Sequence, residues 1–530
     1  MSKIFNTEAD CKPELHYMVD ISDRLRSIEE MIDQGKYFTI NRGRQYGKTT
    51  TLRILANYLR DKYLVVSLDF QDLDSSDFSN VEYFAEAFAD LFYSRVKRSD
   101  DLPQDLLTEL KNFAGGQIPR ANLRKLFSLL KNCCEKASRP VVLLIDEVDT
   151  ASNNQVFLDF LAKLRAGYIN RDAEATFQSV ILAGVYDIKN LKRKFVNKDE
   201  HNAENSPWNI SASFNEDMSF SPGQIAGMLR AYEAEHQTGM DIKYISELIY
   251  EYTSGYPVLV SGICKWIDEE LMGTKEFPDA ASAWTYEGVT ESVGNLLKAS
   301  SPLFESMIRQ ITQTPELGEM LKSILFEGES VSFNPDNAVL SLAAMFGYVK
   351  SESGQVKVSN RIFETRLYNY FLSLEETESA TCKDARDNIN EFVKNDRLDM
   401  ELLLRKFVKH FSAVYADNDQ SFIEKYGRKI FFLYLKPVIN GTGHYYIEAQ
   451  TRDSKRTDII VDYLGQISII ECKIWHGQKY NDDGEQQLID YLDRYDLKKG
   501  YMLTFSFNKK KSSGVETRLF KDKILVEALV

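Results

Sequence analysis

Residues 37–52 read YFTINRGRQYGKTTTL and decide the fold of the N-terminal part of the chain. The apolar alternation over 37–40 predicts a strand, and leucine and isoleucine at helical spacing over 48–59 predict a helix. The loop between them contains Gly43 and Gly47. Strand, glycine-containing loop and helix in this order are typical of a phosphate-binding loop, so both glycines are expected to border a nucleotide.

The residues that open the helix supply the chemistry of such a loop. Backbone N–H groups at a helix N-terminus point at the phosphates. Lys48 is expected to contact the β and γ oxygens of ATP, Thr49 to ligate Mg²⁺, and Thr50 to border the phosphates. The strict pattern asks for a glycine at position 42, where the chain has Arg42. The flanking strand and helix nevertheless favour a nucleotide site.

A second motif, VVLLIDE at residues 141–147, reads as a strand buried on both faces of a parallel sheet. Asp146 and Glu147 lie where this strand ends. In phosphoryl-transfer sites an aspartate here holds Mg²⁺, and the adjacent acid orients the attacking water. A solvated acidic turn is the alternative, but the phosphate-loop pattern earlier in the chain favours an ATPase site.

Length and composition describe a multidomain globular protein. At 530 residues the chain exceeds a single core, and 43% hydrophobic with 27% charged residues is ordinary for globular proteins. No apolar run is long enough for a membrane helix and the N-terminus is polar, so we expect a cytoplasmic protein without membrane contact. The six cysteines form no CxxC pair, which argues against disulfides and structural zinc.

The charge is distributed unevenly. The whole chain has a net charge of −14, whereas residues 401–530 contain 21 Lys and Arg against 18 Asp and Glu. The negative charge therefore belongs to the first 400 residues. Nucleic acid, if it is a partner, is expected at the C-terminal part.

Four further motifs strengthen the ATPase interpretation. They are IDEVD (145–149), SPWNISASF (206–214), DMSFS (217–221) and TSGYP (253–257). In this order behind the phosphate loop, they resemble the AAA-like ATPase domain of many bacterial proteins that also have a C-terminal nuclease-like domain. The resemblance implies a RecA-type core with a helical lid, and a homo-oligomer in which a neighbour's arginine completes the site. Arg165 and Arg171 are candidates for that arginine.

Helix and strand patterns predict five regions. We expect an α/β P-loop core of the RecA/AAA type with a parallel sheet over 1–215 and a helical lid over 216–298. Three helices followed by a hairpin suggest a winged helix over 299–372. The polar composition near 375–387 suggests a linker over 373–398, followed by a small α/β restriction-endonuclease-like domain over 399–530.

A geometric argument points to a metal site in the last region. If Leu464–Gly465 is a two-residue hairpin loop, Asp458 lies directly opposite Glu471 on the neighbouring strand. Lys473 then shares the face of Glu471, because strand side chains alternate. Two facing carboxylates are destabilising unless a cation lies between them, and Mg²⁺ prefers such oxygen ligands. A purely structural ion cluster is the alternative.

The surrounding segments resemble the PD-(D/E)XK nuclease superfamily. They are KPVINGTGHYYIEAQTRD (436–453), TDIIVDY (457–463), IIECKIWHG (469–477) and QQLIDYL (486–492). The resemblance implies a metal-dependent phosphodiesterase with Mg²⁺, or Mn²⁺, bound by Asp458 and Glu471. It also implies Lys473 as a core catalytic residue.

Two further residues carry roles implied by this resemblance. Glu424 matches the acid carried on the preceding helix, with Glu448 as a rival for that role. Gln487 matches the glutamine on the helix after the core strands. Both belong to the expected catalytic set.

Two function hypotheses follow. The first is an ATP-hydrolysing protein coupled to a Mg²⁺-dependent nuclease, acting on DNA rather than RNA, in a setting of defence against phage or mobile DNA. The second is a nucleotide-dependent switch or scaffold whose C-terminal domain binds nucleic acid or a partner without cleaving it. Metal-dependent cleavage distinguishes the two.

Overall fold

The fold is given by a computed structural model of the chain. It describes residues 3–151, 154–185, 208–327, 330–375, 379–395, 397–415, 420–439, 443–449, 457–474, 485–486, 488–489, 491–493, 495–506, 513–520 and 522–530. The side chains of residues 420–425, 443–449, 457–458 and 474 are outside this description. No helix among the described residues is long and apolar enough to cross a membrane.

The chain divides into two compact units. The first contains residues 1–237 together with Gly255–Lys265 and Met345–Gly347. The second contains Thr238–Ser254, Trp266–Ala344 and Tyr348–Val530. This division is coarser than the five regions predicted from sequence, which stay predictions.

A four-stranded parallel sheet forms the centre of the first unit. Its order is β1-β4-β3-β2. The bounds are β1 Phe38–Asn41, β2 Leu64–Asp69, β3 Val141–Asp146 and β4 Ser179–Gly184. Every residue of β3 and β4 is buried, as a sheet covered on both faces requires. The predicted parallel-sheet α/β core is therefore confirmed.

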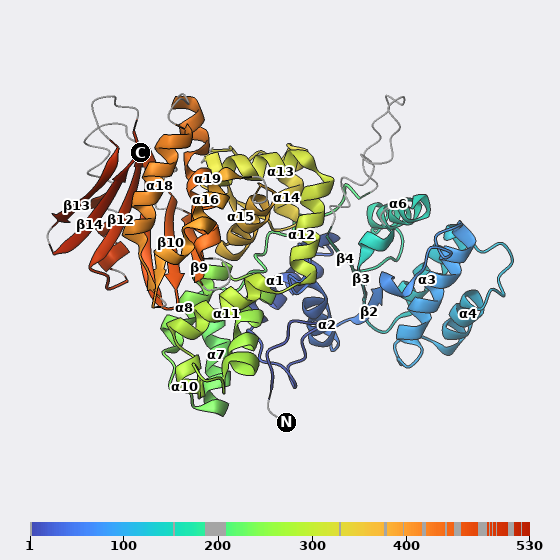
Figure 1. Cartoon of the computed structure of the whole chain (residues 1–530). Helices are drawn as coiled ribbons and strands as arrows, with labels where there is room; N and C mark the ends of the chain where they lie inside the picture. Colours follow the sequence, from blue (N-terminus) through green and yellow to red (C-terminus); the bar gives the residue numbers. More distant parts are fainter. Residues whose placement is uncertain are drawn as a thin grey trace. The chain divides into compact units, whose positions relative to one another are not determined.

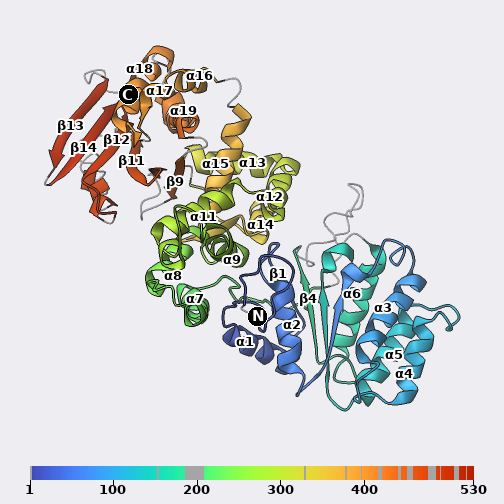
Figure 2. The ribbon, with the colours of Figure 1, turned by 60° about the horizontal axis from the view of Figure 1, so that its bottom comes forward.

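Helices cover both faces of this sheet. Figure 2 shows α1 and α2 on one side and α3, α5 and α6 on the other. The bounds are α1 Ser22–Asp33, α2 Lys48–Leu59, α3 Val81–Val96, α4 Gln104–Ala114, α5 Leu123–Lys136 and α6 Gln155–Ile169. Phenylalanines of α3 and α6 pack around Phe70, which follows β2. Helix α7, Pro222–His236, also belongs to this unit.

The first half of the second unit is helical. Its elements are α8 Ile242–Thr253, the π-helical η4 Trp266–Leu271, α10 Ala280–Ala283, α11 Tyr286–Lys298, α12 Pro302–Gln313, α13 Pro315–Lys322, η5 Ser323–Glu327, α14 Ala338–Met345 and α15 Arg361–Glu375. Helix α9, Pro257–Lys265, lies between α8 and η4 and belongs to the first unit. The strands β5 Val349–Glu352 and β6 Gln355–Val358 form the predicted hairpin after α14.

A six-stranded mixed sheet forms the C-terminal part (Figure 1). Its order is β13-β14-β12-β11-β10-β9. The bounds are β9 Gly443–Ala449, β10 Thr457–Tyr463, β11 Gln466–Ile474, β12 Lys499–Phe505, β13 Gly514–Phe520 and β14 Lys523–Leu529. Helices α18 Met400–Tyr415 and α19 Gln420–Ile439 precede the sheet in the chain and pack against it.

The region predicted as a linker, 373–398, contains a packed helix in its central part. Residues Ala380–Asp387 form helix α16, which packs on α19 and buries Cys382 and Ala385 completely. A short helix α17, Ile389–Phe392, and the two-residue strands β7 and β8 follow, over Val393–Lys394 and Arg397–Leu398. Polar residues form the solvated face of α16, so a polar composition does not exclude a packed helix.

Candidate functional site

The phosphate loop joins the end of β1 to the start of α2. Gly47 caps α2 in the left-handed conformation, with φ of 78°, which favours glycine over any residue with a side chain. Gly43 is required for a different reason. A Cβ built on it would lie 2.4 Å from the carbonyl oxygen of Phe346. The sequence interpretation had assigned Gly43 to phosphate approach alone.

Lys48 is buried at the start of α2, with 6% of its surface exposed. Its ammonium donates hydrogen bonds of 3.0 Å to the carbonyl oxygens of Arg42 and Gly43. Burial lowers the pKa of Lys48, while the charges of Glu147 and Asp149 oppose that shift. The loop therefore curls around the amine that is expected to contact the phosphates.

The two nucleotide motifs meet at Thr49 and Asp146. The Thr49 hydroxyl donates a hydrogen bond of 2.7 Å to Asp146 Oδ2, although the residues are 97 positions apart. The other carboxylate oxygen accepts from the backbone N–H of Glu147 at 2.9 Å. A hydroxyl and a carboxylate within hydrogen-bond distance are the oxygen ligands that Mg²⁺ takes beside a nucleotide. The residues present thus fit the ion.

Glu147 follows Asp146 with an unusual backbone. Its φ of 51° lies in the left-handed region, where a non-glycine residue is uncommon. Burial raises the pKa of Glu147, and it also raises that of Asp146. A raised carboxyl pKa strengthens the carboxylate as a proton acceptor, as orientation and activation of water require.

Thr50 makes a contact that the sequence interpretation did not foresee. Its hydroxyl oxygen accepts a hydrogen bond of 3.1 Å from the backbone N–H of Cys11. Asp10, beside Cys11, forms an ion pair of 2.6 Å with Arg53. Thr50 and Arg53 therefore hold the N-terminal segment on α2, and a role of Thr50 in nucleotide binding stays a prediction.

The two arginines proposed to complete a neighbour's site differ in their surroundings. The Arg171 guanidinium donates to the carbonyl of Gly35 at 3.1 Å and lies over the ring of Tyr168. Arg165 has a buried Nε without a hydrogen-bond partner among the described residues. Both arginines stay candidates for that role.

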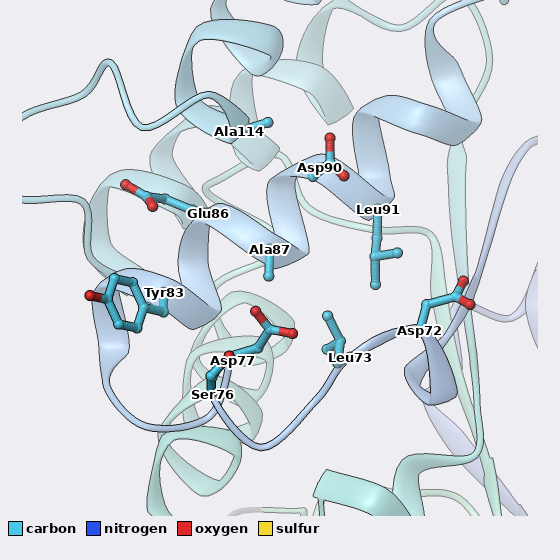
Figure 3. Close-up of a pocket in the computed structure, with 10 residues that line it drawn as sticks. All are labelled: Asp72, Leu73, Ser76, Asp77, Tyr83, Glu86, Ala87, Asp90, Leu91 and Ala114. Atoms are coloured by element: carbon cyan, nitrogen blue, oxygen red, sulfur yellow. The ribbon is translucent and has the colours of Figure 1, made fainter.

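A cavity elsewhere in the first unit is unsuited to binding a nucleotide. A cavity of about 470 Å³ lies beside α3, and Figure 3 shows the side chains that line it. Asp72, Asp77, Glu86 and Asp90 are among them. Burial raises the pKa of Glu86, and the charge of Glu82 adds to this shift. Four carboxyl groups would repel a triphosphate.

The C-terminal hairpin has the register predicted from sequence. Strands β10 and β11 are antiparallel and Asp458 pairs directly with Glu471, while Tyr463 pairs with Gln466 across the Leu464–Gly465 turn. Asp458 also pairs with Glu448 of β9. Three acidic residues therefore share one row of the sheet, although the side chains of Asp458 and Glu448 are outside the described part.

Glu471 is the informative side chain of this row. It is fully buried, at 0% exposure, and neither carboxylate oxygen has a hydrogen-bond partner among the described residues. A buried carboxylate without partners costs several kcal/mol unless a cation compensates it. The orphaned oxygens therefore fit a divalent cation, which is the ion that the facing carboxylates imply.

Lys473 lies two residues further along β11 and is also buried, at 3% exposure. It pairs in register with Thr504 of β12, a residue that the sequence interpretation missed. The Thr504 hydroxyl donates to Glu527 of β14 at 3.2 Å. The pairing of β12 with β11 places Thr504 beside Lys473. No local sequence motif around Thr504 predicts this neighbour.

The remaining predicted nuclease residues are described only in part. Glu424 lies on α19, as expected for a helix-borne acid, but its side chain is outside the described residues. Gln487 lies outside them entirely. Among the side chains that are described, no group of three His, Cys, Asp or Glu is placed to hold a metal ion.

The first unit is a P-loop ATPase core, defined by its parallel sheet, its phosphate loop and the Thr49–Asp146 contact. The chain belongs to the AAA-like domain family, whose model matches residues 15–372. This match confirms the ATPase half of the resemblance seen in the sequence.

Twenty-one chains of solved structures match this chain, and three of them are as follows. The Walker-type ATPase PABY2304 of Pyrococcus abyssi is 15% identical, with 68% of this chain and 99% of that chain covered and a TM-score of 0.46. The ORC1 protein of Aeropyrum pernix, in complex with DNA, is 14% identical over 66% and 93% of the chains, with a TM-score of 0.29. The ORC2 protein of the same organism is 10% identical over 68% and 95%, with a TM-score of 0.32. No curated protein matches the chain.

Proposed function

We propose that the first unit binds and hydrolyses ATP with Mg²⁺, and that the C-terminal domain is a metal-dependent nuclease acting on DNA. The observation that carries the first part is the hydrogen bond between Thr49 and Asp146, supported by membership of the AAA-like family. The observation that carries the second part is the buried carboxylate of Glu471, opposite Asp458 in register, whose oxygens have no hydrogen-bond partner among the described residues.

At the ATPase site each residue has a separate role. The Lys48 ammonium exchanges its two carbonyl acceptors for phosphate oxygens, which bind it more strongly because they are charged. Thr49 and Asp146 hold Mg²⁺, which neutralises charge on the phosphates when bound. Glu147, whose pKa is raised by burial, orients the attacking water and accepts its proton.

ATP turnover by the purified chain tests this part. Lys48→Ala is expected to abolish nucleotide binding, whereas Glu147→Gln is expected to retain binding and lose turnover. Lys131→Ala is a matched control, because Lys131 lies half exposed on α5. Turnover that is equal in wild type and Glu147→Gln would contradict the assignment of Glu147.

At the nuclease site, Asp458 and Glu471 hold the cation, and the Lys473 ammonium stabilises the charge that develops on the phosphate. A Mg²⁺ or Mn²⁺ ion held there would supply polarisation of the phosphodiester and activation of water. Glu424 and Gln487 complete the proposed catalytic set. Burial of Glu471 and Lys473 supports the role, because electrostatic interactions are strong away from water.

Oligonucleotide cleavage in Mg²⁺ or Mn²⁺ tests the nuclease assignment. Among single- and double-stranded DNA and RNA substrates, we expect the DNA to be cleaved and the RNA to stay intact. Asp458→Ala and Lys473→Ala are expected to abolish cleavage, and Glu516→Gln, an exposed carboxylate on the edge strand β13, serves as control. Intact substrates with every metal would favour a nucleotide-dependent switch that binds without cutting.

The proposal includes assembly into a homo-oligomer and a setting in defence against phage or mobile DNA. Arg165 and Arg171 are the proposed residues that a neighbour contributes, and Arg165 is tested first. Mixing Lys48→Ala with Arg165→Ala chains is expected to restore some ATP turnover through hybrid sites. Cells carrying the gene should resist phage better than cells carrying the Asp458→Ala form, and equal phage titres would contradict the defence role.

A further inference from the structure

The phosphate loop has a contact far along the chain, in the turn Met345–Gly347. This turn belongs to the first unit, whereas the residues before and after it belong to the second. The carbonyl of Phe346 approaches Gly43 so closely that a Cβ there would lie 2.4 Å from its oxygen. Gly43 is thus a site of close backbone packing as well as part of the nucleotide loop.

Tyr256 contacts the same loop from the TSGYP motif. Its hydroxyl donates a hydrogen bond of 2.7 Å to the carbonyl of Arg44, and its ring meets Tyr46 edge-on at 4.4 Å between centroids. Gly347 has φ of 76°, and a Cβ on it would lie 3.3 Å from Tyr46 and 3.4 Å from Tyr256. The rings of the two tyrosines therefore pack closely against Gly347.

Nucleotide binding acts on the peptide units that these contacts hold. Lys48 donates to the carbonyls of Arg42 and Gly43, and Tyr256 is bonded to the carbonyl of Arg44, the next along the loop. Phosphate oxygens are stronger acceptors for an ammonium than neutral carbonyls. When Lys48 turns to phosphate, the peptide units at Arg42 and Gly43 lose their shared donor and are free to reorient.

We propose that Tyr256 and the turn Met345–Gly347 form a latch on the phosphate loop, whose contacts depend on bound nucleotide. The proposal rests on ATP binding by the first unit. Through the chain that continues from Gly347, the latch passes the nucleotide state to the hairpin of β5 and β6. Tyr348 is the first residue to respond, because its N–H donates to Ala343 and its carbonyl accepts from Ser359, both at 2.9 Å.

Hydrogen exchange of the full chain tests the latch. Peptides covering residues 343–359 are followed without nucleotide, with ADP and Mg²⁺, and with a non-hydrolysable ATP analogue and Mg²⁺, while calorimetry measures binding in the same samples. We expect nucleotide to change the exchange rate at Tyr348 by about fivefold or more, the scale of one neutral hydrogen bond. Protection over residues 43–50 reports the nucleotide itself.

Tyr256→Phe removes only the hydroxyl that bonds Arg44 and is expected to bind nucleotide while losing most of the response at Tyr348. Tyr58→Phe is the matched control, because Tyr58 lies exposed near the end of α2 and its hydroxyl donates to Glu29 of α1. Gly347→Ala, which presses on both tyrosines, provides a second variant with the same expected loss.

The outcomes separate the latch from ATP binding. Nucleotide that binds and protects residues 43–50 but leaves residues 343–359 unchanged overturns the latch and leaves the proposed ATPase intact. A full response in Tyr256→Phe also overturns it. If calorimetry detects no nucleotide binding at all, the proposed function fails and the latch fails with it.

Discussion

The hydroxyl of Thr49 donates to a carboxylate oxygen of Asp146 at 2.7 Å, joining the phosphate loop to the end of β3. Strands β1 and β3 flank β4 in the sheet, and their C-terminal ends meet at the same edge. Ligands of open parallel sheets bind at such edges. The pair therefore defines where Mg²⁺ and the nucleotide phosphates are expected.

Replacing Thr49 tests this pair. Thr49→Val removes the hydroxyl and keeps the shape, so we expect Mg²⁺ to lose its strengthening effect on ATP binding by about tenfold or more. Calorimetric titration of ATP with and without Mg²⁺ measures the effect. Thr51→Val, two positions along α2 on its buried face, should behave as wild type. An undiminished Mg²⁺ effect in Thr49→Val would remove Thr49 from the site.

The buried carboxylate of Glu471 is expected to affect the free energy of unfolding as well as activity. Without divalent cation and without nucleotide, Glu471→Gln is expected to raise the free energy of unfolding by about 1–3 kcal/mol, because it removes a buried charge whose oxygens have no hydrogen-bond partner among the described residues. Mg²⁺ should stabilise the wild type against heat and leave Glu471→Gln unchanged.

Thermal unfolding with increasing Mg²⁺ measures both effects on Glu471. Glu516→Gln, which alters an exposed carboxylate of the same sheet, is expected to match wild type in each. Equal Mg²⁺ stabilisation of wild type and Glu471→Gln would mean that Glu471 holds no cation.

Because of the buried Glu364 on α15, we expect the free energy of unfolding to depend on pH. Burial raises the pKa of Glu364 to about 8 from its ordinary value of 4.5, against the charges of Arg361, Arg428 and Lys357. Above pH 4.5 the folded state keeps a proton on Glu364 that the unfolded state releases. The contribution of this carboxyl group to the free energy of unfolding is therefore fully present below pH 4.5 and is lost as the pH rises towards about 8.

Glu364→Gln should remove this slope, which is at most about 1.4 kcal/mol per pH unit. Urea unfolding between pH 5 and pH 8 measures it, with Glu319→Gln, exposed on α13, as control. A Glu364→Gln protein whose stability follows pH as steeply as wild type would contradict a buried neutral carboxyl.

Gly255 of the TSGYP motif is expected to tolerate no side chain. Its φ is 74°, and a Cβ there would lie 2.0 Å from the carbonyl oxygen of Phe220. Gly255→Ala should lower the free energy of unfolding by about 2 kcal/mol or more. Gly223→Ala, whose nearest neighbour would be Ser221 Oγ at 3.9 Å, should change it by about 1 kcal/mol or less. Similar unfolding midpoints for the two variants would refute the close packing.

Patterns that follow from local chemistry were predictable from the sequence. The phosphate loop, the buried strand before Asp146 and the register that pairs Asp458 with Glu471 each depend on a short segment and on strand periodicity. The hairpin register followed from the Leu464–Gly465 turn alone, since turn length determines which residues face each other.

Features that depend on distant partners were not predictable. The sequence shows a glycine one residue past the strict pattern, but only the approach of Phe346 explains why position 43 needs it. Helix α16 was predicted as a linker because its buried face is made of small residues, Thr381, Cys382 and Ala385. Helix α19 continues to Ile439 through Pro437, although a proline inside a helix is locally unfavourable.

Crystals of the full chain grown with Mn²⁺ and a non-hydrolysable ATP analogue test the central claim most directly, because anomalous scattering locates the metal. We expect one peak beside Thr49 and Asp146, at the nucleotide phosphates, and a second beside the carboxylate of Glu471. A peak at the nucleotide with none at Glu471 would contradict the proposed nuclease site. A peak at Glu471 with no nucleotide bound at Lys48 would contradict the proposed ATPase.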